Sequence, residues 1–360
     1  MAVGSRPTSR PTSRPTSAVR WPAEWERHDA TWIAWPHHTA DWPGKIATIP
    51  WVYAEIARVL AAHERVEILC HSAPILAAAR RVLTAHGVTR NVRLHTCPSD
   101  RVWLRDSAPT GVIAPDGSLE WVNWAFNGWA KYPNHQRDAK IGAFIARASR
   151  TPRREPVRPD SGLRAVLEGG GIETDGRGTM LVTEEWLLSR VQVRNPGMRR
   201  ADYEALFAAE LGIRRTIWLG EGCVGDDTHG HVDDIARFVA PGVVVIAHEK
   251  DPADANHRRS LDNLRRLRRA RGAPLDVVTL PYPRAVVMAG MRLPASYANF
   301  YIANGVVIVP TFNDPADQVA LATIARLLPR RTVVGIHAVD LVWGLGTLHC
   351  LTQQQPAAAR

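Results

Sequence analysis

Short runs of β-branched and other apolar residues alternate along this chain with segments whose apolar residues recur at helical period. The expected strands are RVEILCH (65–71), GTMLVT (178–183), GVVVIAH (242–248), GVVIVP (305–310) and RTVVGIH (331–337). The expected helices are WVYAEIARVLAAH (51–63), APILAAARRVLTAH (73–86), RADYEALFAAELG (200–212) and DQVALATIARLL (317–328). Strands and helices that alternate in this way indicate an α/β or α+β architecture.

Polar clusters rich in Gly, Asp, His, Glu and Trp recur among these segments. They are WLRDSAP (103–109), FNGW (126–129), LEGGG (167–171), DDTHGHVDD (226–234), ASYANFY (295–301) and GLGTLHC (344–350). Their recurrence suggests several similar units, each of which contributes a loop to one shared centre.

The first residues have a different composition from the rest. The tetrapeptide RPTS is written three times over residues 6–17 and offers no apolar side chain to bury, so we expect residues 1–20 to form a disordered tail. Of the 360 residues, 45% are hydrophobic, which is enough for a substantial core. No linker divides residues 21–356, and we expect one catalytic domain there, with the polar stretch 149–162 as a surface loop.

Several functional classes are disfavoured by composition. No run of 18 apolar residues exists and the tail lacks the apolar region of a signal peptide, so we expect a cytoplasmic protein without membrane contact. Four cysteines without CxxC spacing argue against a disulfide framework or a structural zinc site.

The net charge is +10, and part of it lies in HRRSLDNLRRLRRARG (257–272), where Leu261, Leu264 and Leu267 should face the core. A solvated face is favoured there over a nucleic-acid contact.

The cluster GDDTHGHVDD places His231 two residues before Asp233. On a strand, such positions point to the same face, so both side chains could enter one pocket. Hydrogen bonding within a turn and catalysis are about equally favoured for this segment. A metal site that uses His229 with this pair is the third alternative.

Three other clusters each allow a structural and a chemical interpretation. Asp106 follows Arg105 and could form a surface ion pair. Glu168 precedes three glycines that could form a tight bend, and the segment lacks both GxGxxG and a phosphate-loop ending, which argues against nucleotide binding. Cys350 could be a buried inert thiol. Its glycine-rich turn, however, would also suit a nucleophile whose pKa is lowered by a base or cation.

Together these clusters supply one thiol, one or two histidines and four carboxylates, with two tryptophans nearby. The carboxylates are Asp106, Glu168, Asp227 and Asp233, and the tryptophans are Trp103 and Trp129. Carboxylates gathered in one site predict a cationic substrate, because a cation offsets their mutual repulsion. A guanidinium matches paired carboxylates through its fork of N–H donors, and it offers a thiolate an electrophilic carbon.

The ordered motifs resemble those of the agmatine deiminase family, which belongs with the Porphyromonas-type peptidylarginine deiminases in the guanidino-group-modifying superfamily. The segments that carry the resemblance are WPAEWERHDATWIAWPHH, WLRDSAPT, FNGWAKY, LEGGGIETDGRGTMLVTEEWLLS, GHVDD, ASYANFYIANG and LHCLTQQQP. The resemblance implies a five-bladed α/β propeller of ββαβ modules around a central active site, the pentein fold.

The resemblance also implies residue roles and a reaction. Cys350 would be the nucleophile, His231 the general acid and base, and Glu168 the carboxylate that orients it. Asp106 and Asp233 would hold the guanidinium, while Asp227, Trp103 and Trp129 would bind the rest of the substrate. Agmatine and water would give N-carbamoylputrescine and ammonia through a covalent thiouronium.

No metal or organic cofactor is implied, and the expected partner is a small cationic guanidino compound, with a dimer or tetramer as a possible assembly. Another guanidino compound, such as peptidyl-arginine or a guanidino acid, is the alternative substrate. A metal-dependent amidohydrolase and a non-catalytic polyamine-binding protein are the less favoured alternatives. The sequence departs from the family's GGGNIHC pattern at Leu345 and Thr347, beside the nucleophile.

Overall fold

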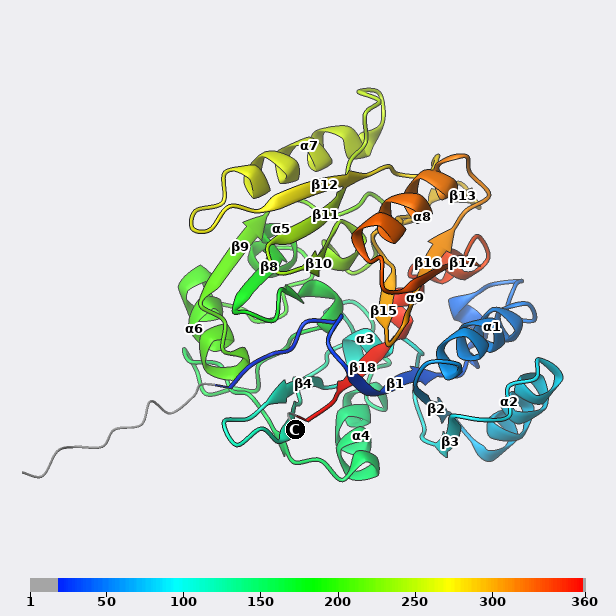
Figure 1. Cartoon of the computed structure of the whole chain (residues 1–360). Helices are drawn as coiled ribbons and strands as arrows, with labels where there is room; N and C mark the ends of the chain where they lie inside the picture. The colour runs from blue at the N-terminus through cyan, green and yellow to red at the C-terminus, as the bar shows by residue number, and fades with distance from the viewer. Residues whose placement is uncertain (1–18, 359–360) are drawn as a thin grey trace, which may run out of the picture.

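A computed structural model describes residues 19–358, which form five mixed sheets and one two-stranded hairpin arranged with their helices on the outside (Figure 1). Residues 1–18, most of the predicted tail, lie outside the described part. The helices are α1 (Ile49–Ala61), α2 (Ala73–Ala85), α3 (Leu104–Ser107), α4 (Ile141–Ser149), α5 (Glu184–Leu188), α6 (Arg200–Leu211), α7 (Ala255–Arg268), α8 (Ala316–Leu327) and α9 (Leu348–Leu351). Short 3-10 turns are η1 (Thr39–Asp41), η2 (Asp138–Lys140), η3 (Gly169–Gly171), η4 (Val232–Asp234) and η5 (Leu341–Gly344).

The strands are β1 (His28–Ala34), β2 (Arg65–Cys70), β3 (Val92–Thr96), β4 (Thr110–Ile113), β5 (Leu119–Val122), β6 (Arg153–Arg154), β7 (Glu173–Thr174), β8 (Thr179–Thr183), β9 (Arg215–Leu219), β10 (Ala236–Ala240), β11 (Val243–Ala247), β12 (Asp276–Leu280), β13 (Val287–Met288), β14 (Met291–Arg292), β15 (Tyr301–Ala303), β16 (Val306–Thr311), β17 (Thr332–His337) and β18 (Gln353–Pro356).

Four of the mixed sheets repeat one topology. In each, the first strand pairs antiparallel with the second, and the second pairs parallel with the third, in the orders β4-β5-β6, β7-β8-β9, β10-β11-β12 and β15-β16-β17. A short connection suffices for the antiparallel pair, whereas the parallel pair needs a crossover, which a helix such as α4, α7 or α8 provides. These units are the ββαβ modules that the resemblance implied.

The remaining sheet joins the two ends of the described chain. Its order is β18-β1-β2-β3, with β18 antiparallel to β1 and the other pairs parallel. In Figure 1 the red β18 runs beside the blue β1 and so closes the ring of modules. The chain is therefore well tied down through Gln355, which pairs with Ala30.

The predicted long helices and strands are confirmed, each within about two residues of its expected bounds. Amphipathic patterning explains this agreement, since α1 buries Tyr53, Ile56 and Leu60 against the largest core cluster. On α7, Leu264 and Leu267 are buried as expected, and Leu261 is only partly so.

Two features differ from the sequence-based predictions. The stretch 149–162, expected to be a loop, contains β6, whose residues pair with Trp121 and Val122 of β5. The first strand of each repeated module was not predicted, because β4, β7, β10 and β15 are only two to five residues long and are surrounded by polar turns.

Among residues 19–358, no helix is both long and apolar enough to cross a membrane.

Candidate active site

Five polar turns meet where the modules converge, and each lies directly before the first strand of a sheet. They carry Asp106 in α3 before β4, Glu168 before β7, Asp233 in η4 before β10, Asn299 before β15, and Cys350 in α9 before β18. Because the modules repeat, these equivalent turns all point to one centre. The recurrence of polar clusters in the sequence is thus explained by the repetition of the module.

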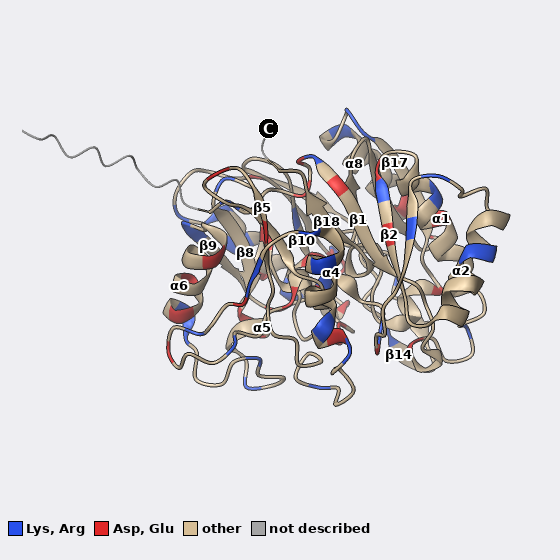
Figure 2. Cartoon of the chain, turned by 90° about the horizontal axis from the view of Figure 1, so that it is seen from below, with Lys and Arg blue, Asp and Glu red and all other residues tan. Residues whose placement is uncertain are grey.

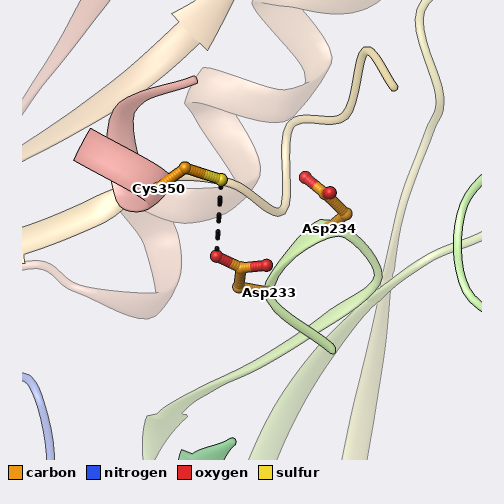
Figure 3. A group of neighbouring side chains, drawn as sticks. All are labelled: Asp233, Asp234 and Cys350. Carbon is orange, nitrogen blue, oxygen red and sulfur yellow. Dashed lines mark hydrogen bonds between the residues drawn. The ribbon is translucent and has the colours of Figure 1, made fainter. Parts of the chain in front are cut away.

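Cys350 lies on the short helix α9 and is 7% exposed. Its Sγ lies 3.6 Å from Asp233 Oδ2 (Figure 3). The same Sγ accepts a hydrogen bond from Asn299 Nδ2 at 3.1 Å. Burial, together with the charges of Asp233, Asp234 and Asp106, raises the pKa of the Cys350 thiol well above its usual value. The thiol is therefore protonated at neutral pH.

His231 is buried between two carboxylates. Its Nδ1 lies 3.7 Å from Asp106 Oδ1, and its Nε2 lies 3.5 Å from Glu168 Oε2. Burial alone would lower the pKa of His231, but the charge of Asp106 and the contact with Glu168 outweigh it and raise the pKa to about 9. His231 therefore carries a proton at neutral pH.

Glu168 is held rigidly and remains charged. Its carboxylate accepts hydrogen bonds from Trp186 Nε1 at 2.7 Å and from Arg194 Nε at 3.0 Å, and both Glu168 and Arg194 side chains are 0% exposed. Although burial raises the pKa of Glu168, the Arg194 charge and His231 outweigh burial and bring the pKa to about 2. The ring of Trp186 also packs edge-on against His231, which fixes the imidazole.

Gly170 lies at the point where three of the site residues meet. A Cβ on Gly170 would come within 2.7 Å of His231 Nδ1, 2.9 Å of Asp106 Oδ1 and 3.1 Å of Asp233 Oδ2. The Gly170 N–H donates to Asp106 Oδ1 at 3.0 Å. The glycine run of LEGGG thus lets the backbone approach the site closely, as well as forming the bend that the sequence predicted.

The pKa values of the two aspartates of the site are shifted in opposite directions. Burial, and the negative charges of Asp233 and Glu168, raise the pKa of Asp106 to about 6 even though His231 lies beside it. Burial also raises the pKa of Asp233, but the hydrogen bond from His349 outweighs burial and lowers it below the usual range. Both aspartates are thus charged at neutral pH.

Two buried atoms of the site have no hydrogen-bond partner among the described residues: His231 Nε2 and Asp233 Oδ1. An unpaired buried polar atom is costly, and in a native structure it calls for an explanation such as a missing ligand. A ligand with N–H donors would satisfy the carboxylate oxygen, and a nitrogen that becomes basic during a reaction could take the proton of His231 Nε2.

A cavity of about 280 Å³ leads from the surface to Cys350. Trp103, Trp129 and Asp106 line it, and Trp129 Nε1 donates to Asp106 Oδ2 at 2.8 Å. Asp227 lies at its exposed end, paired with Lys131 Nζ and accepting the Tyr132 hydroxyl. His231, Glu168 and Asp233 lie behind this lining, so the cavity wall is aromatic with acidic groups at both ends.

The turn before Cys350 depends on its glycines. A Cβ on Gly344 would approach the rings of Trp42 and Trp103 to 3.0 Å or less, and a Cβ on Gly346 would lie 2.8 Å from Trp103. Leu345, between them, has a φ of 71°, a backbone conformation that favours glycine, and its side chain lines the cavity. The departure from the family pattern at Leu345 therefore changes the wall of the cavity.

Sequence reasoning missed the residues that support the turn that carries Cys350. Asn299 Oδ1 accepts from Thr347 Oγ1 at 2.7 Å and from the His349 N–H at 3.0 Å. His349 in turn contacts Asp233 Oδ2 at 2.7 Å and Glu24 Oε2 at 2.9 Å through its two ring nitrogens. Asn299 and His349 stand in the clusters ASYANFY and GLGTLHC, and Glu24 stands in the segment WPAEWERHDATWIAWPHH, which were the available signals.

Two expectations about GDDTHGHVDD are wrong in detail. His231 and Asp233 do not lie on a strand, since η4 begins directly after His231, yet both reach the site because the 3-10 turn packs around Gly170. His229 does not join them: its Nε2 contacts Ser189 Oγ at 3.0 Å. Among the described residues, the acidic and thiol groups close enough to share a cation are Asp233, Asp234 and Cys350. Burial and the charges of Asp233 and Asp226 raise the pKa of Asp234 well above its usual value, which disfavours the charged form that would bind a cation.

Comparison with protein families gives a match over nearly the whole chain. Residues 20–356 match the model of the Porphyromonas-type peptidyl-arginine deiminases. The chain is also 36% identical to the agmatine deiminase of Stutzerimonas stutzeri, over 93% of this chain and 95% of that protein. It is likewise 36% identical to the agmatine deiminase of Pseudomonas aeruginosa, over 98% and 99% of the two chains.

Solved structures give the same result. The agmatine deiminase of Enterococcus faecalis superposes with a TM-score of 0.86 and 28% identity, over 94% of this chain and 96% of that one. An amidinotransferase of Microseira wollei matches at a TM-score of 0.50 and 14% identity, over 95% and 99% of the two chains, which is a likeness of fold alone. The predicted pentein fold is confirmed by these superpositions.

Proposed function

The chain belongs to the Porphyromonas-type peptidyl-arginine deiminase family, and on that premise we propose that it hydrolyses agmatine to N-carbamoylputrescine and ammonia. The observation that carries the proposal is the cavity that ends on Cys350 beside two unpaired buried atoms, Asp233 Oδ1 and His231 Nε2. A guanidinium carries the donors and the leaving nitrogen that these two atoms lack.

The substrate's charge is essential in the proposed binding mode. Asp106 and Asp233 accept the N–H groups of the guanidinium, which places its carbon near Cys350 Sγ. Burial and the nearby carboxylate charges hold the pKa of the Cys350 thiol high, and the arriving cation offsets the carboxylate charges. The thiol therefore releases its proton to solvent when substrate is bound, and the sulfur takes a proton back when the product leaves. Asn299 Nδ2, which donates to Sγ at 3.1 Å, stabilises the thiolate.

The first chemical step forms a carbon–sulfur bond. The Cys350 thiolate attacks the guanidinium carbon and gives a tetrahedral adduct. His231, protonated because its pKa is raised to about 9, gives its proton to the departing nitrogen, and ammonia leaves. A thiouronium bound to Cys350 remains, held by the same two aspartates.

The second step is hydrolysis. The now neutral His231 takes a proton from water, which attacks the thiouronium carbon; the carbon–sulfur bond then breaks and the carbamoyl product leaves. Glu168, ionised because of Arg194 and Trp186, stabilises the imidazolium formed in this step. The scheme uses side chains alone and requires no metal or organic cofactor.

Release of ammonia from agmatine, arginine, 4-guanidinobutyrate and peptidyl-arginine tests the proposal. We expect turnover of agmatine by the intact protein and a loss of at least about a thousandfold in Cys350→Ala, because the nucleophile is removed. Cys223→Ala is the matched control, since Cys223 is also buried and free but lies outside the cavity lining. Full activity in Cys350→Ala, or loss in the control alone, would reject the mechanism.

A second substrate class, the guanidino acids, is favoured by one observation. Lys131 lies beside Asp227 at the exposed end of the cavity, so this end offers a cation as well as a carboxylate. Agmatine would place its amine on Asp227, whereas a guanidino acid would place its carboxylate on Lys131. The two classes differ in the residue on which they depend.

Two variants separate these substrates. Asp227→Asn should raise the KM for agmatine by roughly tenfold, because the ion pair between Asp227 and the amine of agmatine is lost. The KM for 4-guanidinobutyrate should be unchanged or lower. Lys131→Met should raise the KM for 4-guanidinobutyrate and leave the KM for agmatine unchanged or lower. If Asp227→Asn impairs only the guanidino acid, the assignment to agmatine is wrong. The oligomeric state and the cytoplasmic location stay predictions.

A further inference from the structure

A cavity larger than that of the active site lies away from it. It is a groove of about 970 Å³ between α6, β9 and α7, lined by seven arginines and three acidic side chains, and we call it the arginine groove. Figure 1 shows α6, β9 and α7 along one outer side of the ring, away from α9 and β18. In Figure 2, basic segments lie beside β9 and on α6.

The acidic side chains of the groove are already occupied. Glu184 pairs with Arg200 and with Arg266, and Asp262 also pairs with Arg266. The third carboxylate, Glu204, accepts the Trp218 indole N–H at 2.8 Å. Glu204 forms no ion pair with an arginine of the groove, and the seven arginines and three carboxylates of the lining leave it with a net charge of +4.

The other five arginines of the groove have no ion pair with a carboxylate in residues 19–358. Arg214, Arg265, Arg269 and Arg271 are exposed, and Arg215 is half-buried. Arg215 donates from Nη1 to the Ala273 carbonyl at 3.0 Å, while its Nη2 is buried without a partner. Five unpaired guanidinium groups around one hollow repel each other unless an anion binds between them.

The convergence of these side chains is not a property of one helix. Arg265 and Arg269 are four residues apart, at the end of α7 and just after it, where the helix dipole favours basic residues. Arg214 and Arg215, however, come from the start of β9, and Arg271 comes from the loop that follows α7. The dipole of α7 therefore does not explain why Arg214, Arg215 and Arg271 line the same groove.

We propose that the arginine groove is a binding site for an oligophosphate chain, either inorganic or the 5′-polyphosphate of a nucleotide. Guanidinium groups match phosphate oxygens in bidentate geometry, and several phosphates in a row supply enough charge for five arginines. The volume is that of a small-ligand site. Trp218, the tryptophan of the lining, is buried beneath Arg200 and leaves no open aromatic face on which a nucleobase could stack.

Calorimetric titration of the full chain with sodium tripolyphosphate and with ATP tests the site. We expect saturable binding of tripolyphosphate that weakens as salt rises, because the contacts are ionic. Equal affinity for both ligands assigns the site to the phosphate chain alone, and tighter binding of ATP assigns it to a nucleotide; either result supports the proposal. No binding of either ligand, or tighter binding of a single-stranded oligonucleotide per phosphate, overturns it.

Matched variants locate the binding. Arg265→Ala/Arg269→Ala should weaken tripolyphosphate binding by about tenfold or more, since two charge-assisted contacts are removed. Arg80→Ala/Arg81→Ala, which removes two exposed, unpaired arginines on α2, should leave it unchanged. The tail variant Arg6→Ala/Arg10→Ala/Arg14→Ala should also bind normally, and loss of binding there would overturn the assignment to the groove.

The readout is independent of the proposed function, because binding is measured without turnover. Agmatine turnover should be unchanged in Arg265→Ala/Arg269→Ala, which shows that the variant is folded. Cys350→Ala should bind tripolyphosphate like the intact protein. If agmatine is not a substrate but tripolyphosphate binding is lost only in the groove variant, the groove assignment stands alone.

Discussion

Side chains in the site owe their protonation states to their immediate neighbours. Asp106 and His231 are both buried, yet the pKa of Asp106 is raised to about 6 by burial and nearby carboxylates, and the pKa of His231 is raised to about 9 because Asp106 and Glu168 outweigh its burial. The proposed scheme needs Asp106 as a carboxylate and His231 as an imidazolium. Both conditions hold only between these two pKa values.

The pH dependence of kcat/KM for agmatine should therefore be bell-shaped. Activity should fall as pH drops below about 6, because protonated Asp106 no longer attracts the guanidinium, and as pH rises above about 9, because neutral His231 cannot protonate the leaving nitrogen. Initial rates of ammonia release across this range provide the measurement.

Glu168→Gln is the matched test of this assignment. Removal of the Glu168 charge should lower the pKa of His231 and so move the alkaline limb to lower pH, while the acid limb moves little. An alkaline limb that stays in place would mean that it reports another group.

At the scale of the element, the site is made by short turns before the first strands of the sheets. The turn formed by η3 carries no chemistry of its own, but its backbone at Gly170 occupies the space between Asp106, His231 and Asp233. The spacing of these three side chains is therefore set by the backbone of Gly170, which has no side chain of its own.

Gly170→Ala should reduce kcat by about a hundredfold, because a displacement of the site groups by a fraction of an ångström to about one ångström disturbs the geometry of attack. The added Cβ would lie 2.7 Å from His231 Nδ1 and 2.9 Å from Asp106 Oδ1. Steady-state kinetics and a thermal melt separate catalysis from folding.

Gly335→Ala in β17 is the control for this substitution. Its Cβ would lie 2.9 Å from Thr311 Cγ2, so it introduces a similar clash in a strand that does not line the cavity. Both variants should lose some thermal stability, but only Gly170→Ala should lose kcat. Equal effects on kcat would show that the Gly170 clash acts through stability alone.

At the scale of the whole molecule, the ring is closed by the last described strand. β18 pairs with β1, and its glutamines reach neighbouring elements: Gln353 donates to the Pro109 carbonyl at 2.9 Å, and Gln354 accepts from Arg105 Nη1 at 2.7 Å. Trp32 Nε1 donates to Gln355 at 3.1 Å. Since α9 directly precedes β18, closure also fixes Cys350.

Truncation after Thr352 should lower the melting temperature by at least about 5 °C and abolish turnover, because it removes the strand that joins the two ends of the ring. Truncation after Pro356 is the control and should melt within about 2 °C of the intact protein. Differential scanning calorimetry measures both. An unchanged melt in the shorter chain would show that closure contributes little to stability.

The sequence by itself determined the long helices and strands, because their hydrophobic periodicity is a local property. It also identified the polar clusters that carry Cys350, His231 and Glu168, through residue type and motif order. It could not determine that Asp233 lies on a 3-10 turn that begins directly after His231, since three residues are too few for a period.

Only the tertiary structure decided which clusters meet and which groups are charged. Glu24 stands in a segment that resembles the family, but its role there is decided by packing: it holds His349 and through it Asp233, because β1 and β18 join the ends of the chain. The arginine groove also arises only when β9 lies beside α7, although its arginines stand out in the sequence. Contacts between distant segments depend on packing, and burial together with neighbouring charges sets the pKa of each group, so neither can be read from sequence spacing.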